Sequence, residues 1–170
     1  MEADSARPNT LRVVALLQQL EQRFGPQEFG QIVQTLLALT FRTAGFDVLK
    51  NTVGVPDLVI SKPESNMGYS IEVKTGGVRV VLSERDLDGV LSNAKTPVVA
   101  SMFLSDPSSH WLLTDARSLK PGSYRRFELE AKPKVSLGFE VTEEFGRILL
   151  KNHSISMEGQ APLARLLAAT

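Results

Sequence analysis

Three charged residues stand in or beside two short hydrophobic segments, where a buried charge is costly unless it has a partner or a function. The segment "GVPDLVI" (54–60) carries Asp57, and the segment "YSIEVKTGG" (69–77) carries Glu72 and Lys74. Alternate side chains of a strand share a face, so Glu72 and Lys74 point the same way. If the two segments pair as antiparallel strands, Asp57 lies beside the end of the second strand that carries this pair.

Two carboxylates and one amine that converge in this way suit a hard divalent cation. Oxygens of Asp57 and Glu72, the backbone carbonyl of Val73 and water molecules would complete an octahedral shell, which favours Mg²⁺ over Zn²⁺. A bound cation lowers the pKa of a coordinated water and neutralises charge on a phosphate, while Lys74 orients or deprotonates that water. The pattern therefore predicts phosphodiester hydrolysis.

The string "PD", 14 intervening residues and "EVK" resembles the signature of the PD-(D/E)XK nuclease superfamily. The preceding segment, "EFGQIVQTLLALTFRTAGFDV", looks most like Mrr-type restriction nucleases and archaeal-type Holliday-junction resolvases. The resemblance covers about 27–104 and implies a restriction endonuclease-like α-β-β-β-α-β core, with a mixed central sheet flanked by helices. It implies Asp57 and Glu72 as metal ligands, Lys74 as the catalytic lysine, Mg²⁺ as cofactor with Mn²⁺ as a substitute, and a DNA substrate.

The sequence departs from that family at the first core helix. Relatives often supply a further acid there, but this chain has Gly30 and Gln31, and the nearest glutamate is Glu28. Glu28 is a fourth candidate catalytic residue, although it also suits the first turn of a helix, where the macrodipole favours carboxylates. Two alternatives stay open: a site that works with two carboxylates, or a catalytically inactive nuclease-fold subunit that binds DNA or a protein partner.

A different interpretation needs no active site. The charged trio can lie on the solvated face of an edge strand, where charges discourage aggregation, in an unrelated mixed α/β interaction domain.

Hydrophobic periodicity predicts the elements that position the trio. Apolar residues at helical spacing predict helices over 10–24 and from Phe29 to Phe41, separated by "GP" and ended by Gly45. The β-branched segments "FDVLK", "PDLVI", "YSIEVK" and "VRVVL" then predict a strand meander. Ser83 can cap a helix over "ERDLDGVLSN", and "TPVVASMFL" and "HWLLT" predict two further strands.

The C-terminal part carries weaker signals. The segment "YRRFELE" is a strand candidate, and helices are predicted near 141–152 and 161–169. We expect one domain over 1–170, made of the nuclease-like core, an extra N-terminal helix and a C-terminal elaboration over 115–170. Apolar stretches in this elaboration, "FGRILL" and "LARLLAA", are the expected interface of a homodimer.

Composition indicates an ordinary globular protein, with 42% hydrophobic and 22% charged residues and no cysteine for disulfide or thiolate chemistry. The polar start and the lack of a long apolar run predict a cytoplasmic protein without a membrane partner. Because 19 basic residues balance 19 acidic ones, DNA contacts must come from a local basic surface. The candidates are Arg79, Arg85, Arg125 and Arg126.

Overall fold

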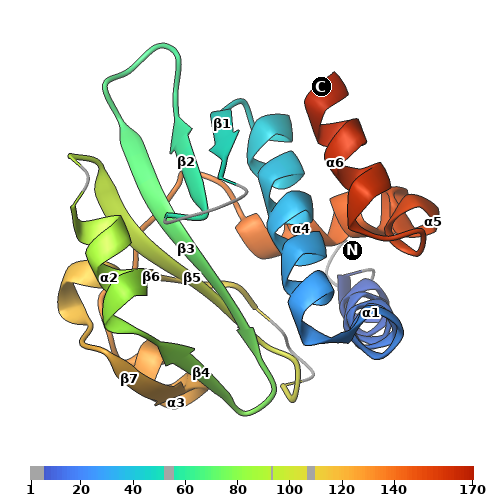
Figure 1. Ribbon diagram of the computed structural model, residues 1–170, viewed down its shortest axis with the longest axis horizontal. Coiled ribbons are helices and arrows are strands. Elements are labelled where there is room, and N and C mark those ends of the chain that lie inside the picture. The colour runs from blue at the N-terminus through green and yellow to red at the C-terminus, as the bar shows by residue number, and fades with distance from the viewer. Residues whose placement is uncertain (1–5, 52–55, 93, 107–109) are drawn as a thin grey trace.

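The structure is a computed structural model that describes residues 6–51, 56–92, 94–106 and 110–170 (Figure 1). The first two residues of the segment 54–60 therefore lie outside the described residues. The elements in chain order are α1 (Ala6–Thr43), β1 (Asp47–Lys50), β2 (Leu58–Ser61), β3 (Gly68–Gly76), β4 (Arg79–Leu82), α2 (Glu84–Leu91), β5 (Thr96–Phe103), β6 (Leu112–Asp115), a 3-10 turn (Ala116–Ser118), β7 (Gly122–Arg125), α3 (Arg126–Glu130), α4 (Val141–Lys151), α5 (His153–Ser156) and α6 (Gln160–Ala169).

A five-stranded mixed sheet with the order β1-β2-β3-β5-β6 forms the centre of the fold. The β2 and β3 strands pair antiparallel, with Leu58 opposite Ile71, as the sequence predicts. The β3 and β5 strands are parallel and are joined through α2, with Glu72 opposite Val99. The predicted order of helix, three strands, helix and strand is thus present, and the restriction endonuclease-like fold class is confirmed.

The predicted meander is wrong at β4. This strand leaves the main sheet and pairs antiparallel with β7 in a separate two-stranded sheet, which we call the ribbon. The reason is that β2 occupies one edge of β3 and β5 occupies the other, so no edge remains for β4. Tight packing at Gly76 turns the chain away, because a Cβ atom there would overlap the backbone oxygen of Arg79.

The strand predicted at "YRRFELE" is also wrong. Only its first two residues belong to β7, and Arg126–Glu130 is the helix α3. The side chain of Glu128 accepts a hydrogen bond from the backbone N–H of Arg125 and so caps the helix. Phe127 is exposed while Leu129 is buried. In a strand these two residues would lie on the same face and would be exposed or buried together.

The larger core lies between one face of the sheet and a layer of helices made of α1, α4, α5 and α6 (Figure 1). Helix α1 is broken at Gly25, whose φ of 77° is not helical, and Pro26 starts its second segment. The predicted stripe of this segment is buried, and Trp111 packs edge-on against Phe145 of α4 at 5.3 Å between ring centroids.

A second, smaller core lies on the opposite face of the sheet. It holds side chains from α2, the ribbon, β5, β6 and α3, namely Val80, Leu82, Leu87, Val90, Val99, Phe103, Leu112, Ala116, Leu119 and Leu129. The predicted cap of α2 is present, since Ser83 Oγ accepts the N–H of Asp86 at 3.0 Å. The side chains of α2 and of the ribbon pack in this same core, and this packing holds the start of α2 close to the end of β3.

The two C-terminal helix predictions are confirmed by α4 and α6. Their apolar side chains, including Phe145, Ile148, Leu149 and Leu163, lie in the chain's own core against α1. The homodimer stays a prediction, and these buried side chains are not available for its interface. In the described residues, no helix is long and apolar enough to cross a membrane.

The turn between β3 and β4 offers a direct test of the packing. We expect Gly76→Ala to lower the free energy of unfolding by about 2 kcal/mol, because the backbone must move to admit the methyl group. The matched control is Gly77→Ala, since nothing lies within 4 Å of a Cβ atom built there. Denaturant unfolding of both variants measures the difference, and equal effects would contradict the packing described for Gly76.

Candidate active site

Asp57 immediately precedes β2 and is fixed through both its backbone and its side chain. Its backbone oxygen accepts the N–H of Asn51 from the end of β1 at 2.9 Å. Its Oδ2 atom accepts the backbone N–H of Val73 in β3 at 2.9 Å. The carboxylate is thereby held beside the part of β3 that carries Glu72 and Lys74.

Glu72 lies at the centre of β3 and is only 4% exposed. Its Oε2 atom is buried and has no hydrogen-bond partner in the described part of the chain. Burial, followed by the negative charge of Asp57, raises the pKa of Glu72 to about 8. Burial also raises the pKa of Asp57, against the hydrogen bond from Val73. Two carboxyl groups are therefore so close that a proton or another cation must neutralise part of their charge.

Lys74 lies two residues further along the same face of β3. Its Nζ atom is 3.4 Å from Oε1 of Glu72 and 2.8 Å from Oδ2 of Asp86. Burial disfavours its ammonium form, but the hydrogen bond with Asp86 and the charge of Glu72 outweigh that effect, so the pKa of Lys74 is raised. The side chain is a positively charged hydrogen-bond donor between two carboxylates.

Asp86 is a site residue that the sequence analysis missed. It belongs to the first turn of α2, where its Oδ2 atom also accepts the backbone N–H of Ser83 at 2.9 Å. This capping box fixes the carboxylate that holds Lys74. The capping pattern of Ser83 followed three residues later by an acid is visible in the sequence, but its contact with β3 depends on how α2 packs.

Glu28 is not placed with the trio by any contact that the structure describes. Its Oε1 atom accepts the backbone N–H of Gln160 at the start of α6, at 3.2 Å. Another α1 residue, Gln31, accepts a hydrogen bond from Lys50 at 3.3 Å. Burial lowers the pKa of Lys50, and the nearby negative charge of Asp57 opposes this effect only in part. Lys50 was not anticipated from the sequence.

The donor atoms at the site fit a divalent cation held by two carboxylates. In the described part of the chain, no group of three or more His, Cys, Asp or Glu side chains is arranged to hold a metal ion. Oε2 of Glu72 is a buried oxygen without a partner, next to the carboxylate of Asp57. The side chain of Val73 points into the larger core, so this residue can offer the site only backbone atoms.

The solvated-face interpretation does not describe this arrangement. Glu72 is buried, and β3 is a central strand with a neighbour on each edge. A charge in such a position needs compensation, which an exposed edge-strand charge does not. The trio is therefore a partly buried charge cluster and not a surface feature.

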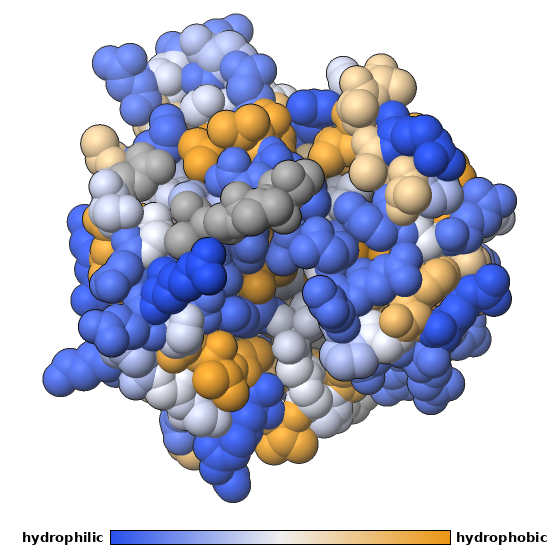
Figure 2. Space-filling view, viewed as in Figure 1, coloured by the Kyte–Doolittle hydropathy of each residue, from blue (hydrophilic) through white to orange (hydrophobic). Residues whose placement is uncertain are grey.

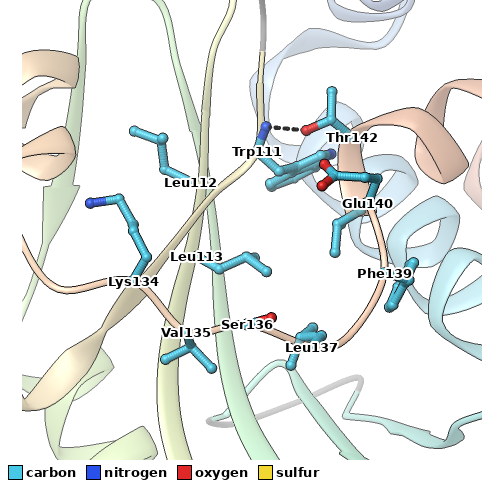
Figure 3. Close-up of a pocket in the computed structure, with 11 residues that line it drawn as sticks. Trp111, Leu112, Leu113, Lys134, Val135, Ser136, Leu137, Phe139, Glu140 and Thr142 are labelled. Atoms are coloured by element: carbon cyan, nitrogen blue, oxygen red, sulfur yellow. Dashed lines mark hydrogen bonds between the residues drawn. The ribbon is translucent and has the colours of Figure 1, made fainter.

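A separate open cavity of about 260 Å³ lies beside β6 (Figure 3). Its lining includes Trp111, Leu113 and Glu140, and the backbone N–H of Trp111 donates to Thr142 Oγ1 at 2.9 Å. It contains none of the charged trio, and β5 separates its strand from β3. The cavity is therefore distinct from the charge cluster.

Comparison with solved structures finds similar folds. No protein-family profile and no curated protein matches the chain. A solved structure of Hjc, a Holliday junction resolvase from Archaeoglobus fulgidus, is similar over 58% of this chain and 92% of that chain. The sequence identity is 16% and the TM-score is 0.45. At this level of similarity, the interpretation of the site rests on the residues of the chain itself.

The raised pKa of Glu72 predicts a pH-dependent stability. In metal-free protein the native state holds a proton on Glu72 between its ordinary pKa of 4.5 and about 8, whereas the unfolded state has released it. Stability therefore falls as the pH rises through this window. Glu72→Gln removes the titrating group but keeps the size of the side chain. The unfolding free energy of the variant, relative to that of wild type, should therefore be about 2 kcal/mol or more higher at pH 8 than at pH 5.

Denaturant unfolding in EDTA at several pH values measures this gain. A difference between wild type and Glu72→Gln that does not change from pH 5 to pH 8 would show that Glu72 titrates as an ordinary surface carboxyl group.

Proposed function

We propose that the protein is a divalent-metal-dependent endonuclease that hydrolyses phosphodiester bonds of duplex or branched DNA. One observation carries the proposal: a buried glutamate oxygen without a partner lies beside a second carboxylate and a lysine, at the spacing of a PD-(D/E)XK motif. Surface charge pairs do not leave a carboxylate oxygen buried and unsatisfied. A cation at this position would satisfy it.

Each residue of the site has a role that follows from its contacts. Asp57 and Glu72 would hold Mg²⁺, or Mn²⁺ in its place, and the bound cation neutralises phosphate charge and activates water for attack. Lys74 is an ammonium group, so its role is to orient the attacking water or a phosphate oxygen as a donor, and not to accept a proton. Asp86 positions Lys74 through the contact of 2.8 Å between its Oδ2 atom and the Nζ atom of Lys74.

We retain the homodimer as part of the proposal. Two active sites related by a two-fold axis would cut the two strands of a duplex symmetrically. Light scattering at micromolar concentration tests this, and a monomer would count against it.

A second candidate is a nuclease-fold subunit that binds DNA or a protein partner without cutting. Two observations favour it: Lys74 already compensates Glu72, and Glu28 is bound to the start of α6. This candidate predicts binding to DNA without cleavage in Mg²⁺ or Mn²⁺.

The charged trio gives variants with different expected results. Asp57→Asn and Glu72→Gln each remove a negative ligand, so Mn²⁺ affinity and cleavage should both fall, with cleavage reduced at least 100-fold. Lys74→Ala should keep most of the metal affinity and still lose cleavage, because it removes no ligand. Titration calorimetry with Mn²⁺ and a cleavage assay on duplex and branched DNA separate these effects. Wild-type cleavage by Asp57→Asn would refute the nuclease assignment.

Asp86 and Ser83 form a matched pair of variants, because both contribute to the cap of α2 but only Asp86 contacts Lys74. Ser83→Ala and Asp86→Ala should each lower the unfolding free energy by about 1 kcal/mol. Only Asp86→Ala should also lower kcat, because only Asp86 holds Lys74. Equal kcat values for the two variants would mean that Asp86 acts only as a helix cap.

A further inference from the structure

The ribbon has a buried face and an exposed face of different character. Its inner side chains, among them Val80, Leu82 and Tyr124, pack in the smaller core. On the outer face, Arg79 of β4 lies directly opposite Arg125 of β7. Figure 1 places the ribbon and α3 at the lower left, beside α2, and Figure 2 shows apolar atoms reaching the surface at the lower end of this view, among hydrophilic ones.

The two opposed arginines have no anionic partner among the residues that the structure describes. Like charges directly opposite each other in a sheet repel. Neither arginine forms an ion pair with any residue that the structure describes. The only side-chain contact of Arg79 among the described hydrogen bonds is with Ser123 at 3.5 Å. A pair of cations in this position fits an external anion, such as a phosphate.

Arg126, by contrast, is bound within the protein. It lies 2.9 Å from Asp106 and 2.6 Å from Glu130. Of the four arginines that the sequence suggested for phosphate contacts, Arg126 is thus already paired with acids of the protein itself. Arg85 is exposed in the first turn of α2, next to the ribbon.

An open groove of about 560 Å³ runs along the ribbon where β7 meets α3. Its apolar lining includes Val78 and Phe127, which are 61% and 64% exposed. Its two acids, Asp106 and Glu130, both bind Arg126, and Arg125 forms no ion pair with any residue that the structure describes, although the lining as a whole has no net formal charge. An exposed aromatic ring beside a free guanidinium group matches a nucleotide, since the ring can stack on a base and the cation can bind its phosphate.

The ribbon is physically connected to the charge cluster. Strand β4 ends at Leu82 and continues through Ser83 into the turn of α2 that carries Asp86, the partner of Lys74. At about 3.3 Å per strand residue, Arg79 lies roughly 10 Å from Leu82 along the ribbon. The backbone of Arg79 also lies against Gly76, two residues beyond Lys74 in β3, so one nucleic acid strand can contact both the ribbon and the site.

We propose that this groove binds an unpaired nucleotide of the DNA substrate close to the bond that is cut. The base stacks on Phe127, while Arg125 and Arg79 bind the adjacent phosphates. Bases of an intact duplex are stacked on one another, so an exposed phenyl ring gains its stacking energy only from a base that is splayed out. The inference rests on the proposed nuclease function and narrows its substrate to DNA with unpaired nucleotides beside a duplex.

Binding can be measured separately from cleavage by fluorescence anisotropy in EDTA. The probes are a labelled duplex and the same duplex with a central unpaired loop. The variants are Phe127→Ala, Arg79→Ala and Arg125→Ala, all at exposed positions where folding should be unaffected. Matched controls on the opposite side of the molecule are Arg165→Ala in α6 and Leu11→Ala in α1, the latter 62% exposed.

Wild type should bind the looped probe more tightly than the duplex. Phe127→Ala should weaken binding to the looped probe about ten-fold and leave duplex binding nearly unchanged, and Phe127→Trp should restore it. Arg79→Ala and Arg125→Ala should weaken binding to both probes, and each should reduce the slope of log affinity against log salt by about 1. The two control variants should match wild type.

Several results would overturn the inference: no preference for the looped probe, equal losses on both probes for Phe127→Ala, or losses as large for Arg165→Ala. The nuclease proposal is tested separately, by whether cleavage depends on Asp57. Cleavage without any effect of Phe127→Ala or the two arginine variants would retain the nuclease and reject the groove. Phe127-dependent binding without cleavage would retain the groove and reject the nuclease.

Discussion

The burial of one carboxylate, Glu72, at the centre of the sheet is the constraint on which the candidate site depends. A charge at that depth is unstable unless it is protonated, paired or bound to a cation. Its pKa is raised to about 8, Lys74 lies 3.4 Å away, and one of its oxygens has no partner among the described residues. Asp57, fixed by the backbone of Val73, adds a second negative charge beside it. Such an arrangement costs stability in the empty protein, which is a common property of sites that bind ligands.

The two faces of the sheet have different roles: one packs the larger core, and the other carries the charged side chains of the candidate site. On the α1 face the sheet packs against a large apolar core, which holds β2 and β3 in register and so brings Asp57 to Glu72. On the α2 face a smaller core leaves room for the charged side chains of β3 and brings Asp86 to Lys74. The ribbon belongs to the second face, so the surface with Arg79 and Arg125 lies on the same side of the sheet as the charge cluster.

The parts of this arrangement that depend on local pattern could be predicted from the sequence. Strand periodicity placed Glu72 and Lys74 on one strand and Asp57 at the start of its antiparallel neighbour, and capping chemistry placed the start of α2. The parts that depend on which edge or face is already occupied could not. The departure of β4 follows from the filled edges of β3, the role of Asp86 follows from the packing of α2, and the engagement of Glu28 follows from α6, which is 132 residues away in sequence. None of these has a local signal.

Locating the cation is the most direct test of the central claim that Asp57 and Glu72 form a metal site. An anomalous difference map from crystals of the protein grown with Mn²⁺ identifies the ion independently of activity. A peak within coordination distance of a carboxylate oxygen of Asp57 and of Oε2 of Glu72 is expected, and it should be absent from crystals of Glu72→Gln. A wild-type map without that peak, in which Glu72 contacts only Lys74, would contradict the metal site and the nuclease function built on it.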